Sequence, residues 1–317
     1  MLSIMIMMWL YIILGLLILV SSADFLVRGA VNLSNIFKIS PYIIAGTLVA
    51  FGTSAPELFV SGIASYSGNP GAAIGNILGS NIANVFLALG IAAIIINISP
   101  PKNAFQIDIK VLAASSIILI ILLFNISLVY WWVGLILILS LFIYIFYIIK
   151  FSDVNNVEEN NKQNLSLSKA LIFFFIGLIG VSLGAKLLTE GSIDLARYFG
   201  IRETIIGLGV LAFGTSLPEV ATSIIAAIKK ENNIAIGNIV GSNIFNILGI
   251  GGVTILISGN EALKANPNLL TISDTLPFIL SSIILVAFYK YRLVVNRLYG
   301  VLFVTSYLVW ISFIFIK

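Results

Sequence analysis

Apolar stretches of about 20 residues, the length needed to cross a bilayer, follow one another along almost the whole chain. The longest polar stretch between them is SDVNNVEENNKQNLSLS at 152–168, near the middle. Because this stretch is rich in Asn and lacks apolar periodicity, we interpret it as a flexible linker. Hydropathy predicts ten membrane-spanning helices. They cover residues 4–27, 41–66, 71–98, 107–126, 130–150, 167–196, 203–228, 234–258, 269–289 and 298–316.

The composition agrees with this pattern, since 60% of the residues are hydrophobic and only 9% are charged. Soluble domains carry about 25% charged residues, so we predict an all-α integral membrane protein. The chain contains no His and no Cys, which excludes disulfides, imidazole or thiolate metal sites, and Ser–His or Cys–His catalysis. We expect a protein that is not an enzyme and holds no cofactor. Any metal it binds must be a hard cation held by oxygen atoms.

Two sequence blocks occur twice, 162 residues apart. VAFGTSAPE at 49–57 matches LAFGTSLPE at 211–219 in seven of nine positions, and AIGNILGSNIAN at 73–84 matches AIGNIVGSNIFN at 235–246 in ten of twelve. The same shift aligns the halves without a gap from about Leu19 to Gly90. Gly, Pro, Glu and Asn matching in register indicate an internal duplication.

Each half holds five predicted spans, an odd number, so the second copy enters the membrane upside down relative to the first. Inverted repeats of this kind are typical of transporters. The predicted organisation is a first repeat at 1–151 with its motifs at 46–90, the linker at 152–168, and a second repeat at 169–317 with its motifs at 208–252.

Basic residues are unequally divided between the two sides of the predicted helices. Ten of them share the side of the linker, and this excess places that side in the cytoplasm and both termini outside. The ten are Lys38, Lys102, Lys150, Lys162, Lys169, Lys229, Lys230, Lys290, Arg292 and Arg297, whereas the other side carries Arg197, Arg202, Lys264 and Lys317.

Prolines interrupt the second and seventh predicted spans. Pro56 and Pro218 lack an N–H, so the carbonyls of Gly52 and Gly214 lose their usual helical donor. Neighbouring glycines ease local unwinding, and in hydrocarbon a free carbonyl needs a cavity or a partner. The sequence therefore predicts that helices two and seven are discontinuous, and that a bound cation is one such partner.

Polar side chains at helical spacing accompany the prolines. Glu57 and Glu219 near the bilayer centre each cost at least about 2.5 kcal/mol without a partner. Spans two, three, seven and eight contain no Lys or Arg, so the missing counter-charge is a transported cation or a proton. Gly75, Gly79, Gly237 and Gly241 are expected to let spans three and eight approach other helices closely, so that the blocks meet in one central site. The side-chain oxygens that share these faces belong to Thr53, Ser54, Glu57, Ser80, Asn84, Thr215, Ser216, Glu219, Ser242 and Asn246.

GTSAPE with GNILGSNIAN, and GTSLPE with GNIVGSNIFN, resemble the two alpha-repeats of the sodium/calcium exchanger family, most closely its compact prokaryotic members. The resemblance covers nearly the whole chain. It implies a ten-helix antiporter in the plasma membrane that exchanges several Na⁺ for one Ca²⁺ by alternating access, with spans one and six moving against the other eight. It also implies that the carbonyls of Ala50 and Ala212 join the side chains above as ligands.

Several alternatives stay open. Family members that also carry K⁺ have Asp at the position of Asn246, which argues against K⁺ transport here, and a branch that exchanges H⁺ for Ca²⁺ usually shows a GNAxE-type motif in place of GTSxPE. A passive channel and an intramembrane hydrolase are the other readings. We expect a monomer with Na⁺, Ca²⁺ and lipid as its partners and no nucleic acid.

The remaining charged residues in the spans have structural interpretations. Asp24 with Arg28, and Lys186 with Glu190, are four residues apart and predict ion pairs along one helix face. Asp108 lies near a span start, where capping or exposure at the interface suffices.

Overall fold

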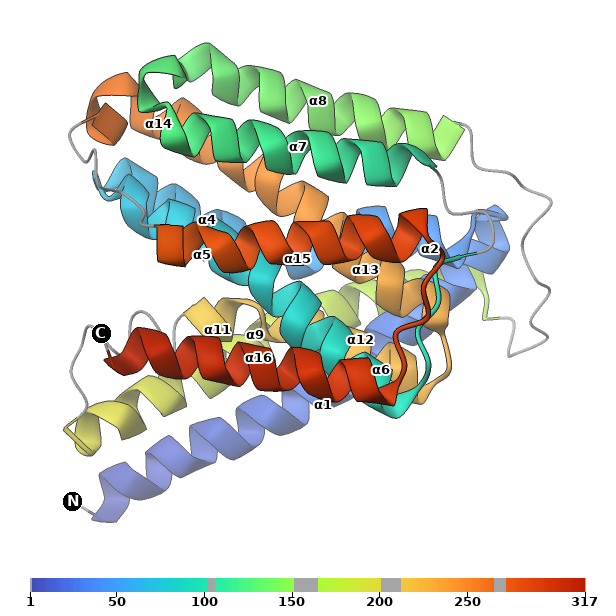
Figure 1. Cartoon of the computed structure of the whole chain (residues 1–317). Coiled ribbons are helices and arrows are strands. Elements are labelled where there is room, and N and C mark those ends of the chain that lie inside the picture. Colours follow the sequence, from blue (N-terminus) through green and yellow to red (C-terminus); the bar gives the residue numbers. More distant parts are fainter. Residues whose placement is uncertain (1, 102–105, 151–164, 201–211, 265–271, 317) are drawn as a thin grey trace.

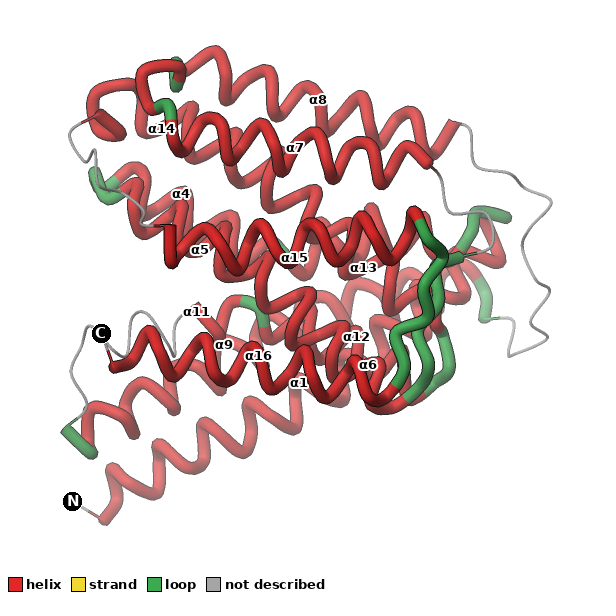
Figure 2. The backbone as a smooth tube through the Cα atoms, in the orientation of Figure 1, coloured by secondary structure: helices red, strands yellow, loops and turns green. Residues whose placement is uncertain are grey.

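The computed structural model describes residues 2–101, 106–150, 165–200, 212–264 and 272–316 (Figure 1). Helices dominate these segments (Figure 2), and the described residues contain one isolated β-bridge, between Ile98 and Val295, and no longer strand. Helix α1 begins and helix α16 ends on the same side of the molecule, at the left of Figure 1. Helix α8 ends on the opposite side.

Although residues 203–211 of the seventh span and 152–164 of the predicted linker lie outside the described residues, the described helices overlap the predicted spans. In chain order they are α1 (Leu2–Phe37), α2 (Pro41–Ile44), η1 (Ala45–Val49), α3 (Ala50–Thr53), α4 (Ala55–Tyr66), α5 (Pro70–Ala83), η2 (Asn84–Leu89), α6 (Gly90–Ile95), α7 (Gln106–Phe124), η3 (Ile126–Leu128), α8 (Trp131–Lys150), α9 (Leu167–Tyr198), α11 (Ala212–Thr215), α12 (Leu217–Ile228), α13 (Asn232–Phe245), η6 (Asn246–Ile250), α14 (Gly251–Lys264), α15 (Ile272–Lys290) and α16 (Arg297–Ile316).

One boundary differs clearly from the prediction. The first span was placed at 4–27, but α1 continues to Phe37. Polar residues such as Asn32 lower the hydropathy of its last turns, while Ala30 and Leu33 on the same turns are fully buried against the protein. Packing thus extends a helix that hydropathy alone ends too early.

Six described helices are long and apolar enough to cross a bilayer, and the bent pair Pro41–Thr53 and Ala55–Tyr66 is a seventh candidate. Shorter apolar helices at Leu217–Ile228, Thr275–Lys290 and Arg297–Phe313 fall in predicted spans seven, nine and ten. The chain is a multi-pass, nearly all-helical membrane protein.

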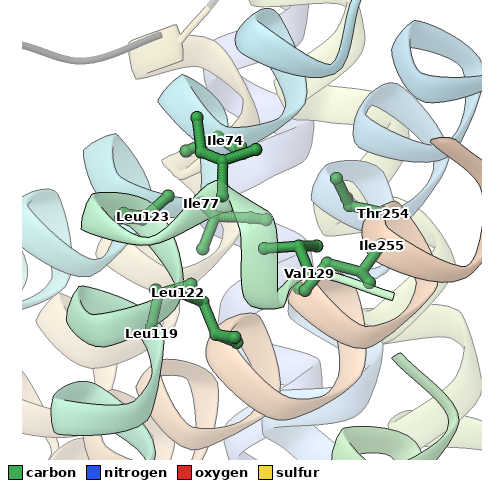
Figure 3. Close-up of a pocket in the computed structure, with 10 residues that line it drawn as sticks. Ile74, Ile77, Leu119, Leu122, Leu123, Val129, Thr254 and Ile255 are labelled. Atoms are coloured by element: carbon green, nitrogen blue, oxygen red, sulfur yellow. The ribbon is translucent and has the colours of Figure 1, made fainter. Parts of the chain in front are cut away.

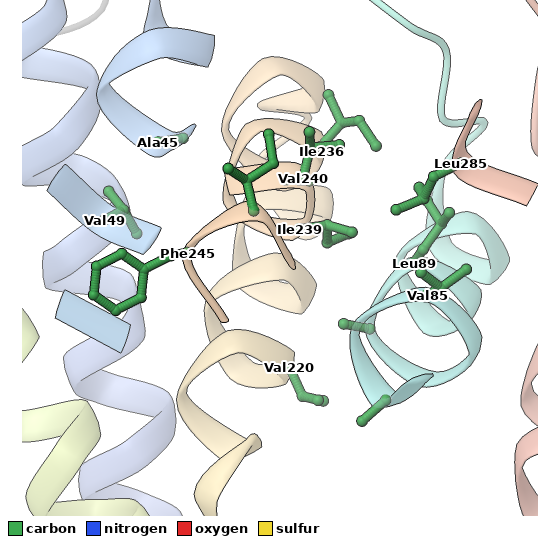
Figure 4. Packing of buried hydrophobic residues seen from close by; sticks show 14 of the residues in the cluster. Ala45, Val49, Val85, Leu89, Val220, Ile236, Ile239, Val240, Phe245 and Leu285 are labelled. Atoms are coloured by element: carbon green, nitrogen blue, oxygen red, sulfur yellow. The ribbon is translucent and has the colours of Figure 1, made fainter. Parts of the chain in front are cut away.

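The centre of the molecule is formed by α5 and α13 with the helices that continue them. In their most apolar windows 78% and 89% of the residues are buried, compared with 17% to 33% for α1, α7, α8 and α9. Figure 4 shows side chains of α13 directed toward η1 on one side and toward η2 on the other. Gly241 permits this packing, because a Cβ there would collide with the backbone of Gly46. Gly75 and Gly79 were expected to allow a close approach as well, and this was wrong, since a Cβ at either position would meet nothing within 4 Å.

Helices α1 and α9 form a separate pair at one side of the molecule (Figure 1). Each is far longer than its neighbours, at 36 and 32 residues. Glycines let their backbones touch: a Cβ on Gly177 would collide with Leu26, and one on Gly29 would collide with Phe174. The pair therefore packs much more closely to itself than to the remaining helices.

Candidate cation site

The two predicted helix interruptions occur at repeat-related serines. Helix α3 ends before Ser54 and α4 begins after it, and the pair Pro41–Thr53 and Ala55–Tyr66 is bent by 43°. Helix α11 ends before Ser216 and α12 begins after it, with a nearly identical backbone conformation. Each new helix has its proline in the first turn, where the missing N–H costs nothing.

Glu57 and Glu219 lie in the first turns of α4 and α12, the helices that restart after these interruptions. The free N–H groups at a helix start carry partial positive charge, which favours a carboxylate there. Both side chains are at most 1% exposed, and the two carboxylates are close enough for their charges to interact. The interruptions thus place two acids together inside the protein.

Hydrogen bonds join the two blocks directly. Ser54 Oγ of the first donates to Glu219 Oε1 of the second over 2.8 Å. Asn246 Nδ2 of the second donates to Ser80 Oγ of the first over 3.1 Å. The predicted meeting of both blocks in one place is therefore present. All ten predicted side-chain ligands are at most 6% exposed, namely Thr53, Ser54, Glu57, Ser80, Asn84, Thr215, Ser216, Glu219, Ser242 and Asn246.

Two further asparagines, which were not among the predicted ligands, also form hydrogen bonds between the two blocks. Asn76 Oδ1 accepts from Thr215 Oγ1 at 3.1 Å, while its Nδ2 donates to the Glu57 carbonyl at 3.3 Å. Asn238 repeats this, accepting from Thr53 Oγ1 at 3.3 Å and donating to the Glu219 carbonyl at 3.4 Å. Asn76 lies four residues before Ser80, so extending the Ser80–Asn84 stripe by one helical turn would have found it.

The region of Asn84 is less symmetric. Asn84 Nδ2 donates to Asn243 Oδ1 over 3.1 Å, although its repeat partner Asn246 donates to a serine. Asn243 is also absent from the predicted ligands. Residues Asn84 and Asn246 each begin a π-helical turn, η2 and η6, a feature frequent at functional sites.

Unpaired oxygens concentrate in this region. Eleven buried polar side-chain atoms have no hydrogen-bond partner in the described part of the chain, and seven of them belong to predicted ligands. Buried polar groups are normally paired, because leaving one without a partner costs about 1–3 kcal/mol. The seven are both carboxylate oxygens of Glu57, Glu219 Oε2, Asn84 Oδ1, Asn246 Oδ1, Ser216 Oγ and Ser242 Oγ.

The chemistry of these oxygens fits a hard cation. Within the described ranges no ion pair involves Glu57 or Glu219. Carboxylate, amide and hydroxyl oxygens are the donors that Ca²⁺ and similar ions take. No group of three or more acidic, His or Cys residues is found in the described segments, so the site is built from two acids and neutral oxygens.

The two predicted carbonyl ligands, Ala50 and Ala212, differ from the side-chain ligands in their surroundings. Ala50 O accepts hydrogen bonds from Ser54 N at 3.0 Å and from Thr53 Oγ1 at 3.4 Å. Both of its lone pairs are therefore engaged, although the hydrogen bond from Thr53 is long and shares its proton with Asn238 Oδ1. Ala212 is the first residue of α11 and its surroundings lie outside the described residues.

An apolar cavity of about 30 Å³ elsewhere in the bundle does not belong to this site. Figure 3 shows its lining of Ile74, Ile77 and other aliphatic side chains from α5, α7 and α14. Thr254 contributes its one polar side chain. A cation has no anionic partner there.

Asp108 was predicted to be a cap or an exposed interfacial residue, and this was wrong. Its side chain is buried, and its two oxygens accept hydrogen bonds of 2.8 Å from Tyr42 and Tyr144. Tyr289 donates in turn to Tyr42 over 2.9 Å. The tyrosines come from α2, α8 and α15, so only the tertiary fold reveals them.

Comparison with known proteins decides the family. The model of the family "Sodium/calcium exchanger protein" matches residues 7–150 and 169–316. The chain belongs to the sodium/calcium exchanger family. Members of this family are transporters, and cation/calcium antiport is the activity that the family and the fold support.

Individual exchangers resemble the chain over nearly its full length. The sodium/calcium exchanger MaX1 of Methanosarcina acetivorans is 30% identical over 97% of this chain and 98% of its own. An uncharacterized membrane protein of Methanocaldococcus jannaschii, MJ0091, is 34% identical over 95% and 96%. A structure of the sodium-calcium exchanger NCX_Mj, soaked with 10 mM Na⁺ and zero Ca²⁺, superposes with a TM-score of 0.81 at 33% identity, covering 97% of this chain and 99% of the other.

Proposed function

We propose that this protein exchanges Na⁺ for Ca²⁺ across the cell membrane, with both ions using the oxygens around Glu57 and Glu219. The observation that carries the proposal is the cluster of seven buried, unpaired oxygen atoms around two acids that have no basic partner among the described residues. Two carboxylates match the charge of one divalent or two monovalent cations. Occupation by either kind of ion therefore excludes the other.

The mechanism is alternating access by ten spans arranged as two inverted repeats. Helices α1 and α9, which pack closely to one another, move as a unit against the other eight spans. The site then faces each side in turn. The side that contains the predicted linker is the cytoplasm, and both termini are outside, as the basic loop residues indicate.

Within the proposed ligand set, Glu57, Glu219 and the amide oxygens of Asn84 and Asn246 supply the strongest donors. The hydroxyls of Thr53 and Thr215 donate to the opposite asparagines, and their oxygens are proposed as ligands. Ser54, Ser80, Ser216 and Ser242 complete the set, with the carbonyls of Ala50 and Ala212. The Asn246 amide, in place of an acid, favours exchange without K⁺.

The direct test is uptake of radioactive Ca²⁺ into proteoliposomes loaded with Na⁺, K⁺ or protons. We expect uptake only when Na⁺ is inside and absent outside. Uptake driven by a pH gradient without Na⁺ would select the H⁺/Ca²⁺ antiporter instead. A requirement for K⁺ on the side of Ca²⁺ would select the K⁺-dependent exchanger. Flux that ignores every counter-ion gradient would identify a channel.

Electrical measurement tests the stoichiometry. If three Na⁺ exchange for one Ca²⁺, each cycle moves one net charge, worth about 2.3 kcal/mol per 100 mV. We therefore expect the initial rate of Ca²⁺ uptake to rise when the vesicle interior, which loses Na⁺, is made positive. A rate that is the same at all membrane potentials contradicts this stoichiometry and supports two Na⁺ per Ca²⁺.

A further inference from the structure

An ion pair joins the α1–α9 pair to the rest of the protein. Asp24 of α1 accepts from Arg28 Nε over 2.7 Å within its own helix. Its other carboxylate oxygen contacts Lys229 Nζ, and Lys229 is the C-cap residue directly after α12. The Asp24 carboxylate therefore pairs with two basic side chains, one from its own helix and one from the end of α12. Lys229 and Asp24 are only 26% and 30% exposed, so the contact is partly shielded from solvent.

The second repeat has the same positions but not the same contact. A shift of 162 residues carries Asp24 onto Lys186 and Arg28 onto Glu190, so the ion pair within the helix recurs with its charges exchanged. Lys186 and Glu190 are 3.8 Å apart and 69% and 49% exposed. The same shift carries Lys229 onto Ser67, which ends α4 and has no charge.

The two ends of the molecule therefore differ. At the end of α12, an ion pair ties α1 to a helix that carries part of the cation site. At the end of α4, no ion pair links α9 to α4 within the residues that the structure describes. In the proposed inverted repeats, the contact of α1 with the end of α12 and the corresponding contact of α9 with the end of α4 are expected on opposite sides of the membrane. When the transporter changes the side to which it opens, one of these contacts is expected to close as the other opens.

The side of the membrane on which the ion pair lies indicates which conformation of the transporter it stabilises. Helix α12 leads from the interruption at Ser216 to the loop with Lys229 and Lys230, on the side that the basic loops assign to the cytoplasm. Holding α1 against the end of α12 closes that side. We propose that the Asp24–Lys229 ion pair is a latch on the cytoplasmic side, which shifts the equilibrium toward the outward-facing state when no ion is bound.

This proposal rests on the proposed function, because it needs α1 and α9 to move against the other spans. Its strength follows from its exposure. A partly exposed ion pair changes an equilibrium by roughly two- to fivefold, which biases the two states without locking either one. Because exposed charges are screened by salt, the bias should decrease between low and high ionic strength.

Cysteine accessibility tests the latch, since the chain contains no Cys of its own. Ala226 is fully buried and lies about one turn before Lys229, at the end of α12 that contacts α1, so we choose Ala226→Cys as the reporter of opening at this end. We expect Lys229→Gln and Asp24→Asn each to raise its rate of labelling by a hydrophilic thiol reagent roughly two- to fivefold, in ion-free detergent solution. Lys186→Gln, which alters the exposed pair in the other repeat, is the matched control and should leave the rate unchanged.

Reversal of the charges separates the latch from a general loss of packing. The double variant Asp24→Lys with Lys229→Asp, made together with Arg28→Gln so that no like charge adjoins position 24, restores attraction, and we expect it to return the labelling rate to that of Arg28→Gln alone. Unchanged labelling in both single variants, or no recovery in the reversed pair, overturns the latch. These measurements need no transport, so absence of Na⁺-driven Ca²⁺ uptake in the unaltered protein would contradict the proposed function separately.

Discussion

The two halves of the cation site are built from nearly identical sequences, yet they are not used identically. Asn76 and Asn238 make the same three kinds of hydrogen bond: to the opposite threonine, to a glutamate carbonyl, and to Ser61 or Ser223 on the same helix as that glutamate. This framework is symmetric because every member of it is duplicated. It positions the two interrupted helices against each other.

The acids inside that framework differ. Glu219 Oε1 accepts a hydrogen bond of 2.8 Å from Ser54 Oγ, whereas Ser216 lies near Glu57 without reaching full hydrogen-bond geometry with either of its oxygens. An ion therefore gains most on the side of Glu57, and the Ser54–Glu219 bond is one that the protein already makes without it. The hydrogen bonds of the framework are therefore the same in both repeats, whereas the two acids and their serines differ in how they are hydrogen-bonded before an ion binds.

Removing the charge of either acid should have the largest effect on transport. We expect Glu57→Gln and Glu219→Gln each to lower Ca²⁺ uptake by more than about 100-fold, because a buried charge interaction of about 3–5 kcal/mol is lost. Uptake into proteoliposomes measures this. Glu190→Gln removes an acid that is half exposed on α9 and should retain most of the activity. Activity that survives in either site variant would exclude a shared two-acid site.

Truncating the framework tests its symmetry. Asn76→Ala and Asn238→Ala each remove the amide that pairs with a buried threonine and a glutamate carbonyl, and a buried polar group left unpaired costs about 1–3 kcal/mol. We expect both to lower the thermal stability of the ion-free protein by similar amounts and to reduce Ca²⁺ affinity roughly tenfold. Thermal unfolding and equilibrium binding of Ca²⁺ measure the two effects. A loss confined to one variant would show that the framework is not symmetric.

Substituting the serines beside the two acids tests the difference between Glu57 and Glu219, and we expect these substitutions to have the smallest effects. Ser54→Ala removes a hydrogen bond to a carboxylate, worth about 1.5–3 kcal/mol, and should lower the unfolding temperature of the ion-free protein. Ser216→Ala removes only the looser contact with Glu57 and should lower that temperature less. Both should weaken Ca²⁺ binding severalfold if both hydroxyls are ligands. Equal unfolding temperatures for the two variants would contradict the asymmetry.

The parts of this site that sequence could predict are those that the duplication repeats. Glu57 and Glu219, with Pro56 and Pro218 in register, stand out because a carboxylate and a helix interruption are both costly in a membrane. The break itself occurs two residues before each proline, at Ser54 and Ser216, as the lost helical donors require. Ten spans and their inverted order stay predictions made from hydropathy and the repeat.

The parts that sequence missed depend on partners from distant elements. Asn76 and Asn238 resemble ordinary packing amides until the fold brings the opposite threonine to them. Asp108 looks like an interfacial residue until Tyr42 and Tyr144, 66 and 36 residues away, cover it. Hydropathy also could not place the end of α1, because its last turns are polar on one face and packed on the other.

The central claim is that a cation occupies the unpaired oxygens between Glu57 and Glu219. It is tested most directly by the anomalous scattering of Sr²⁺ in crystals of this protein grown without Na⁺, with a second set soaked in Na⁺. We predict one strong peak at coordination distance from both carboxylates, which disappears as Na⁺ replaces Sr²⁺. A peak away from these acids, or acids that are paired with a basic side chain and bind no Sr²⁺, would contradict the account.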